Sequence, residues 1–133
     1  MNAEPVPIDD SPGGFFFGPP ESLPGEEGRI ANIPASIRSK QKLLRTLADQ
    51  LQLPDYFGQN WDALEECLRD LSWLPAGHVQ IRHRDLPFSP GSPDRRTYLQ
   101  VLRAATAHWS ESGSQRLICQ FPPDAKCEIL EST

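Results

Sequence analysis

Short strand-like runs that alternate with helical stretches constrain the fold of this chain more than any other feature. The strand-like runs are residues 29–33, 78–83 and 116–121. The stretches with apolar residues at helical spacing are 39–51, 60–71 and 94–110. Parallel strands need crossover connections, and helices between strands supply them. We therefore predict an α/β fold with a small three-stranded parallel sheet packed with about three helices.

The length and composition of the chain favour one structured domain. Its 133 residues and 38 % hydrophobic content can build a single modest core. Residues 1–28 contain acids, prolines and glycines but no lysine or arginine, a composition that does not order itself unaided. We predict an irregular N-terminal extension at 1–28 and a domain at 29–133. Within the extension, Phe15–Phe17 either docks as an extra edge strand or serves as an exposed motif for a partner.

The net charge of −5 argues against general binding to nucleic acids or anionic membranes and favours a basic partner. No apolar run reaches the roughly eighteen residues that span a bilayer. The first residues lack the basic and apolar parts of a signal peptide. We expect a cytoplasmic protein that is a monomer when free and that does not bind a membrane.

Enzyme motifs are missing from the sequence. There is no G-x-S-x-G, no glycine-rich phosphate loop and no H-E-x-x-H. The carboxylates Asp62, Glu66 and Asp70 have the chemistry to bind Mg²⁺ or Ca²⁺, but they lack a glycine-rich coordinating loop. We predict no catalytic residue, no metal and no cofactor, and we retain a carboxylate-based metal hydrolase as an alternative.

The cysteines and the basic residues receive structural interpretations. Cys67, Cys119 and Cys127 form no CxxC pair, and we interpret Cys67 and Cys119 as buried, reduced thiols. A nucleic-acid patch needs aromatic platforms or a recognisable module. Neither accompanies the basic group, so we interpret that group as solvating a strand end and a loop. Its members are Arg82, His83, Arg84, Arg95 and Arg96.

The helix predicted at 60–71 has an apolar side and an acidic side. The apolar side, which predicts the core face, contains Trp61, Leu64, Cys67, Leu68 and Leu71. The opposite side contains Asp62, Glu65, Glu66, Arg69 and Asp70. Asn60 suits the N-cap, and Asp62 suits the first turn. Asp62, Glu66 and Asp70 are spaced i, i+4, where like charges repel by a few tenths of a kcal/mol per pair. This repulsion indicates a face kept for something positive.

The segment 53–68, LPDYFGQNWDALEECL, resembles the signature of the barstar family, the intracellular inhibitors of secreted bacterial ribonucleases of the barnase type. Leu-Pro, an aromatic pair, Gly, Asn, Asp-Ala-Leu, an acid and Cys-Leu occur in register without gaps. The resemblance covers residues 29 to about 121. It implies a barstar-like fold and an inhibitor rather than an enzyme.

The resemblance also implies a binding mode. Proteins of this family insert the start of the helix and its preceding loop into the nuclease active site, where carboxylates take the positions of RNA phosphates. Glu66 falls at the position of the family's principal phosphate-mimicking aspartate. The residues expected to bind the partner are Tyr56, Gly58, Asn60, Asp62, Glu65 and Glu66.

Three positions depart from the family pattern. Glu65 replaces an interface tryptophan, Arg69 replaces a small polar residue, and Ala104 stands where a contacting glutamate is expected. These departures favour a target other than barnase. Our hypothesis is a bacterial immunity protein, of the toxin–antitoxin kind, that blocks a basic ribonuclease or nuclease-type toxin. The alternative is a barstar-fold interaction module that binds a basic protein other than a nuclease.

Overall fold

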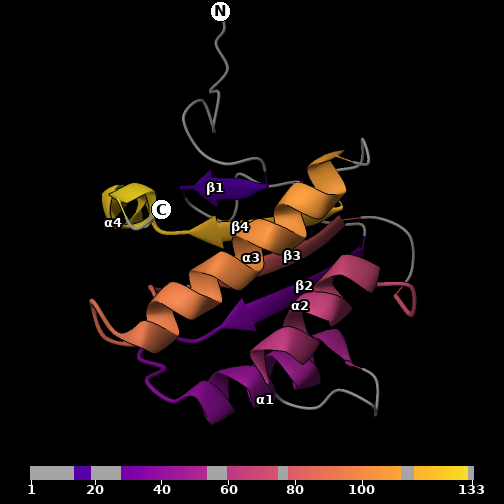
Figure 1. Ribbon diagram of the computed structural model, residues 1–133, viewed down its shortest axis with the longest axis horizontal. Helices are drawn as coiled ribbons and strands as arrows, with labels where there is room; N and C mark the ends of the chain where they lie inside the picture. Colours follow the sequence, from indigo (N-terminus) through magenta and orange to yellow (C-terminus); the bar gives the residue numbers. More distant parts are fainter. Residues whose placement is uncertain (1–13, 19–27, 54–59, 75–77, 112–115, 132–133) are drawn as a thin grey trace, which may run out of the picture.

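A four-stranded, entirely parallel sheet forms the centre of the computed structural model, which describes residues 14–18, 28–53, 60–74, 78–111 and 116–131. Its strands are β1 (Phe15–Phe17), β2 (Gly28–Ile33), β3 (His78–His83) and β4 (Leu117–Phe121). They lie in the order β1-β4-β3-β2 (Figure 1). The predicted parallel α/β class is confirmed, but the expected number of three strands is wrong because β1 adds a fourth.

The phenylalanine run forms an edge strand rather than an exposed motif. Phe15 lies in register with Cys119, is 1 % exposed, and has its ring centroid 5.4 Å from that of Phe121. The amide N–H of Cys119 donates to the carbonyl of Gly14 at 2.7 Å. Burial of apolar aromatic surface offsets the entropy cost of ordering this short strand. The boundary between residues 28 and 29 stays a prediction, although the sheet recruits residues that precede it.

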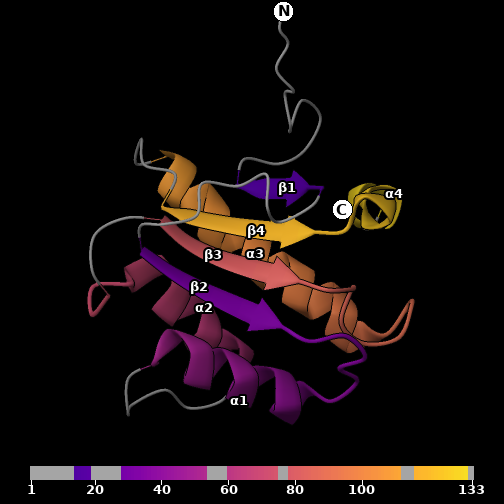
Figure 2. The same ribbon diagram turned by 180° about the vertical axis from the view of Figure 1, so that it is seen from behind.

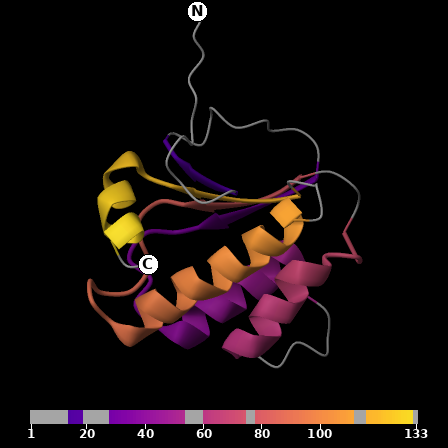
Figure 3. The ribbon, with the colours of Figure 1, turned by 45° about the horizontal axis from the view of Figure 1, so that its top comes forward.

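The helices are α1 (Lys40–Leu51), α2 (Trp61–Asp70), α3 (Pro93–Glu111) and the short α4 (Lys126–Glu131). Helices α1, α2 and α3 lie on one side of the sheet (Figure 3), and Figure 2 shows the other face, over which no described helix passes. We call this second face the open face. Serine side chains cap two of the helices, Ser39 at α1 and Ser92 at α3.

The segment after β4 forms the short helix α4. A 3-10 turn at Pro123–Ala125 leads directly into this helix. Proline pre-sets the backbone angle of a first helical turn. Ile129 is fully buried, and its carbonyl accepts a hydrogen bond from Arg103 Nη2 at 2.7 Å.

Two members of the basic group are buried, so the interpretation of the whole group as solvated is wrong for them. Arg95 is 8 % exposed, pairs with Glu128, and donates to the carbonyls of three loop residues, Leu86, Pro87 and Phe88. These buried carbonyls need donors, and the guanidinium supplies them. His83 is 2 % exposed, because alternation along β3 turns it towards the helices.

Candidate functional site

Helix α2 begins as its sequence predicts. The Asn60 backbone is extended, and its side-chain oxygen accepts a hydrogen bond from the amide N–H of Ala63 at 2.7 Å. Asp62 lies in the first turn, where the positive end of the helix dipole favours a carboxylate. The predicted N-cap is therefore confirmed, and the beginning of the acidic face is fixed by local hydrogen bonding.

Aromatic side chains hold α2 at both ends. The half-buried Trp61 ring lies 6.0 Å from the Tyr98 ring and 6.2 Å from the Phe88 ring, measured between centroids. Near the other end, the indole N–H of Trp109 donates to the carbonyl of Leu68 at 2.8 Å. This donor satisfies a carbonyl that the end of the helix would otherwise leave unpaired. The helix is thus a rigid support for the side chains on its outer face.

The outer face of α2 carries a row of acids, Asp62, Glu65, Glu66 and Asp70, which we call the acidic ridge. Asp62, Glu66 and Asp70 are exposed and make no hydrogen bond or ion pair with the described residues. Glu65 pairs with Arg69, with 3.2 Å between Oε2 and Nη1. Such an exposed i, i+4 pair is worth only about 0.3–0.5 kcal/mol. Within the described part of the chain, these three carboxylates are therefore available to a binding partner.

The field of the acidic ridge acts on the thiol beneath it. Burial raises the pKa of Cys67, and the negative charges of Asp70 and Glu66 raise it further. Burial also raises the pKa of Cys119. The predicted buried thiols are confirmed at these two positions, and neither environment favours a nucleophilic thiolate. The side chain of Cys127 lies outside the described part of the chain.

Only part of the expected contact set lies within the described residues. Asn60, Asp62, Glu65 and Glu66 lie together at the start and along the outer face of α2. Tyr56 and Gly58 lie outside the described residues. Within the described ranges, no three His, Cys, Asp or Glu side chains come together as a metal-binding group. The ridge carboxylates follow one another along a helix rather than converging on one point.

A buried polar network was missed by the sequence reasoning. The Nδ1 atom of His83 lies 2.7 Å from the carbonyl oxygen of Gln120, and Nε2 lies 2.8 Å from the Tyr98 hydroxyl. A carbonyl oxygen only accepts, so Nδ1 carries the proton and Nε2 accepts from Tyr98. Burial lowers the pKa of His83 to about 4, although the bond to Gln120 opposes this effect. The signal was present, because His83 alternates in phase with the apolar Val79 and Ile81.

The comparison with protein families gives one match. A model of the family described as Barstar (barnase inhibitor) matches residues 33–119. None of the curated proteins compared with the chain matches it. As for membranes, no helix in the described ranges combines the length and the apolar character that a bilayer crossing demands.

The match covers well over half of the 133 residues. It includes α1, α2, β3 and α3 with the whole acidic ridge, and it leaves β1 and α4 outside. The chain therefore belongs to the barstar (barnase inhibitor) family.

Proposed function

We propose that this protein is an immunity protein that inhibits a basic ribonuclease by placing the start of α2 and the acidic ridge in the nuclease active site. The observation that carries the proposal is the exposure of Asp62 and Glu66 without a partner among the described residues, on a helix held at both ends. Membership of a family of ribonuclease inhibitors supports this use of the ridge.

Electrostatics favours a positively charged partner at this surface. Like charges at i, i+4 repel, and cationic groups brought between them remove that repulsion. Complementary charge speeds the encounter, and desolvated pairs slow the dissociation. A support that is rigid before binding loses less conformational entropy on association. The ridge therefore suits the pocket of an enzyme that normally binds RNA phosphates.

The proposed contact set is Tyr56, Gly58, Asn60, Asp62, Glu65 and Glu66. Glu65 and Arg69 face the same side of α2 as an ion pair, so a charged pair occupies a place where the family has an apolar contact. This pair favours a partner whose rim differs from that of barnase. We place the complex in the cytoplasm of a bacterium, where an immunity protein meets its nuclease.

The test is inhibition of RNA cleavage by basic ribonucleases of the barnase type, beginning with any such enzyme encoded beside this gene. The wild-type chain should abolish cleavage at near-stoichiometric amounts. Both Glu66→Ala and the near-isosteric Glu66→Gln should raise the dissociation constant at least about tenfold, because they leave a cation of the partner unpaired at the interface. Binding is measured by calorimetry and cleavage by a fluorogenic RNA.

Glu111→Gln is the matched control. Glu111 is an exposed carboxylate at the end of α3, and its removal changes the net charge equally. This variant should inhibit like the wild type. Full inhibition by both Glu66 variants would contradict the role given to the ridge. Capture of a basic protein without nuclease activity as the sole partner would favour the alternative interaction module.

A further inference from the structure

A cavity of about 340 Å³ lies on the open face, at the ends of the strands. It is lined by Gly18, Asn32, Arg82, His83, Arg84, Gln120, Pro122 and Pro123. These residues come from the carboxyl ends of β2, β3 and β4 and from the residue after β1. In open α/β sheets, ligands bind in crevices at the carboxyl ends of the strands. Its volume is within the range of small-molecule sites.

One wall of this cavity is held in a fixed position by hydrogen bonds. Gln120 is 2 % exposed, and both ends of its side chain are used: Oε1 accepts from the amide N–H of His83 at 3.0 Å, and Nε2 donates to the carbonyl of Gly18 at 2.8 Å. The wall therefore offers a fixed shape, and the donors for a ligand must come from the rim.

The rim carries two arginines without an acidic partner among the described residues. Arg82 Nε donates to Gln80 Oε1 at 2.9 Å, and its terminal nitrogens make no hydrogen bond with the described residues. The side chain of the exposed Arg84 makes no hydrogen bond or ion pair within the described ranges. In a chain of net charge −5, two neighbouring guanidinium groups without an acidic partner among the described residues can receive an anion.

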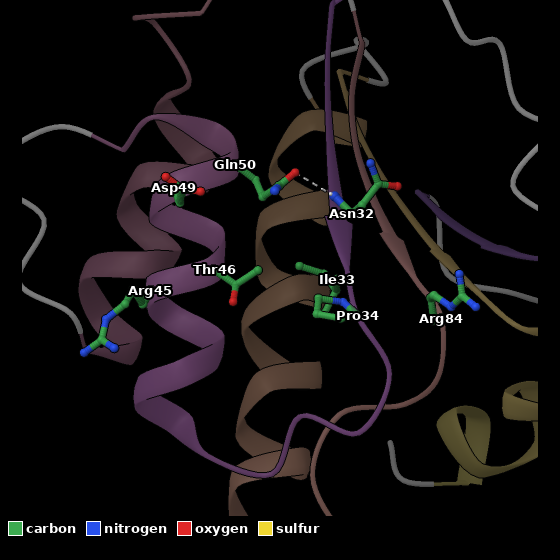
Figure 4. A pocket seen from close by; sticks show the side chains of 8 residues that line it. All are labelled: Asn32, Ile33, Pro34, Arg45, Thr46, Asp49, Gln50 and Arg84. Carbon is green, nitrogen blue, oxygen red and sulfur yellow. Dashed lines mark hydrogen bonds between the residues drawn. The ribbon is translucent and has the colours of Figure 1, made fainter.

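The side-chain amide of Asn32 is a third donor, and the pairing of β2 with β3 brings it beside the arginines. Asn32 lies in register with Arg82, and the amide N–H of Arg84 continues the ladder by donating to the carbonyl of Ile33 at 3.1 Å. Figure 4 is drawn around a second pocket, which Asn32 and Arg84 also line, and it shows their side chains on the far side of β2 from α1. Side chains two residues apart on a strand share a face. Asn32, Arg82 and Arg84 thus form one donor cluster on the open face, which we call the arginine rim.

We propose that the arginine rim and its cavity bind the phosphate group of a small molecule of about mononucleotide size. Guanidinium groups bind oxyanions in a bidentate way. A phosphate monoester carries a charge of about −1.5 to −2 at neutral pH and can neutralise both arginines, whereas one carboxylate neutralises only one. Pro122 and Pro123 supply an apolar wall for the rest of the molecule. This site is distinct from the acidic ridge, because α2 lies on the helix side of the sheet.

The test is a titration of the full ¹⁵N-labelled chain, followed by amide NMR, with adenosine monophosphate, inorganic phosphate and glutamate as probes. Saturable shifts at Asn32, Arg82 and Arg84 are expected with both phosphates. A higher affinity for the nucleotide would show that the apolar wall takes part. Equal affinities would assign the site to the phosphate group alone, and either result supports the proposal.

Variants separate a site from a general attraction of anions. Arg84→Gln and Arg82→Gln should each weaken phosphate binding about tenfold or more, since each removes a charge-assisted donor. Arg96→Gln removes an exposed arginine from α3 and should leave the affinity unchanged. The proposal is overturned if Arg96→Gln weakens binding equally, if glutamate binds better than both phosphates, or if no saturation occurs below about 10 mM.

Discussion

At the scale of single residues, the protonation of the buried His83 bears directly on stability. Its ring is fully enclosed and stacks on Phe121, with centroids 4.2 Å apart and an interplanar angle of 9°. In the neutral ring that burial favours, Nδ1 donates to the Gln120 carbonyl and Nε2 accepts from the Tyr98 hydroxyl, so both nitrogens are hydrogen-bonded without a charge. Protonation would place a charge in this enclosed site, where burial disfavours it.

We predict that the free energy of unfolding falls as pH drops from 6.5 towards 4. The unfolded chain binds a proton at His83 near pH 6.5, but the folded chain does so only near its pKa of about 4. The unfolded state thus holds more protons in this window, and stability rises with pH. The full difference is about 3 kcal/mol, present above pH 6.5.

Urea denaturation at several pH values, compared between variants, checks this prediction. His83→Gln should remove the part of the pH dependence between 6.5 and 4 that carboxylate titration does not cause. The control His108→Gln replaces a half-buried histidine of α3 outside this site, so the comparison of the two variants isolates the effect of position 83. Parallel curves for His83→Gln and wild type would refute the assignment.

At the scale of elements, strand β1 depends on the glycine before it. Gly14 has φ +91°, and a Cβ at this position would lie 2.6 Å from Cβ of Thr106 on α3. The strand therefore begins where the backbone passes a helix more closely than any side chain allows. Its other end is tied through the carbonyl of Gly18 to Gln120.

We predict that Gly14→Ala loosens β1 from the sheet. Gly91 is a matched control, because it has φ +78° with open space around its Cβ position. Gly91→Ala should cost about 1 kcal/mol from backbone strain alone. Gly14→Ala should cost about 1–3 kcal/mol more, because the neighbouring helix must shift.

Hydrogen exchange separates a local effect from a global one. In Gly14→Ala the amides of Phe15–Phe17 should exchange faster, while those in the middle of β3 stay protected. If the two glycine variants lost equal amounts of unfolding free energy, the close approach of Gly14 to α3 would not contribute to the effect of Gly14→Ala.

The elements predicted well are those set by local sequence. Asn60 caps the start of α2 as predicted, and the side chains of Ser39 and Ser92 cap α1 and α3 in the same local way. The fourth strand could not be assigned in this way, because its pairing joins residues about a hundred positions apart, as in the contact of Gln120 with Gly18. A short apolar run does not by itself indicate which edge of a sheet it will join.

The site shows the same division between local and tertiary information. The acidic face of α2 follows from helical periodicity, so Asp62 and Glu66 could be placed from the sequence. The burial of Arg95 could not, because it depends on carbonyls that a loop brings together only in the folded chain. The arginine rim likewise needs the register of β2 against β3, which places Asn32 beside Arg82.

At the scale of the whole molecule, the two proposed binding surfaces lie on opposite sides of the sheet. The acidic ridge lies on the helix side, and the arginine rim lies on the open face. Surface charges act over about 10 Å at 0.1 M salt. Under the proposed function, the local field at α2 guides a basic partner to the acidic ridge, and the arginine rim lies on the other side of the sheet.

We predict that association with a basic ribonuclease slows as salt increases. The association rate constant should fall about tenfold or more between low and high ionic strength, while the dissociation rate constant changes much less. Stopped-flow mixing at a series of NaCl concentrations measures both. A salt-independent association rate would mean that the ridge does not guide the encounter, even if the complex forms.

The fluorescence of the three tryptophans can report on binding and on folding. Trp61 stands next to Asn60 at the start of α2, with the Lys40 ammonium 5.5 Å from the centre of its ring. Trp73 and Trp109 instead donate from their indoles to carbonyls near the ends of α1 and α2. The fluorescence emission of Trp61 should therefore change when a partner binds at the start of α2. The emission of Trp73 and Trp109 should instead report whether the carboxyl ends of α1 and α2 stay folded.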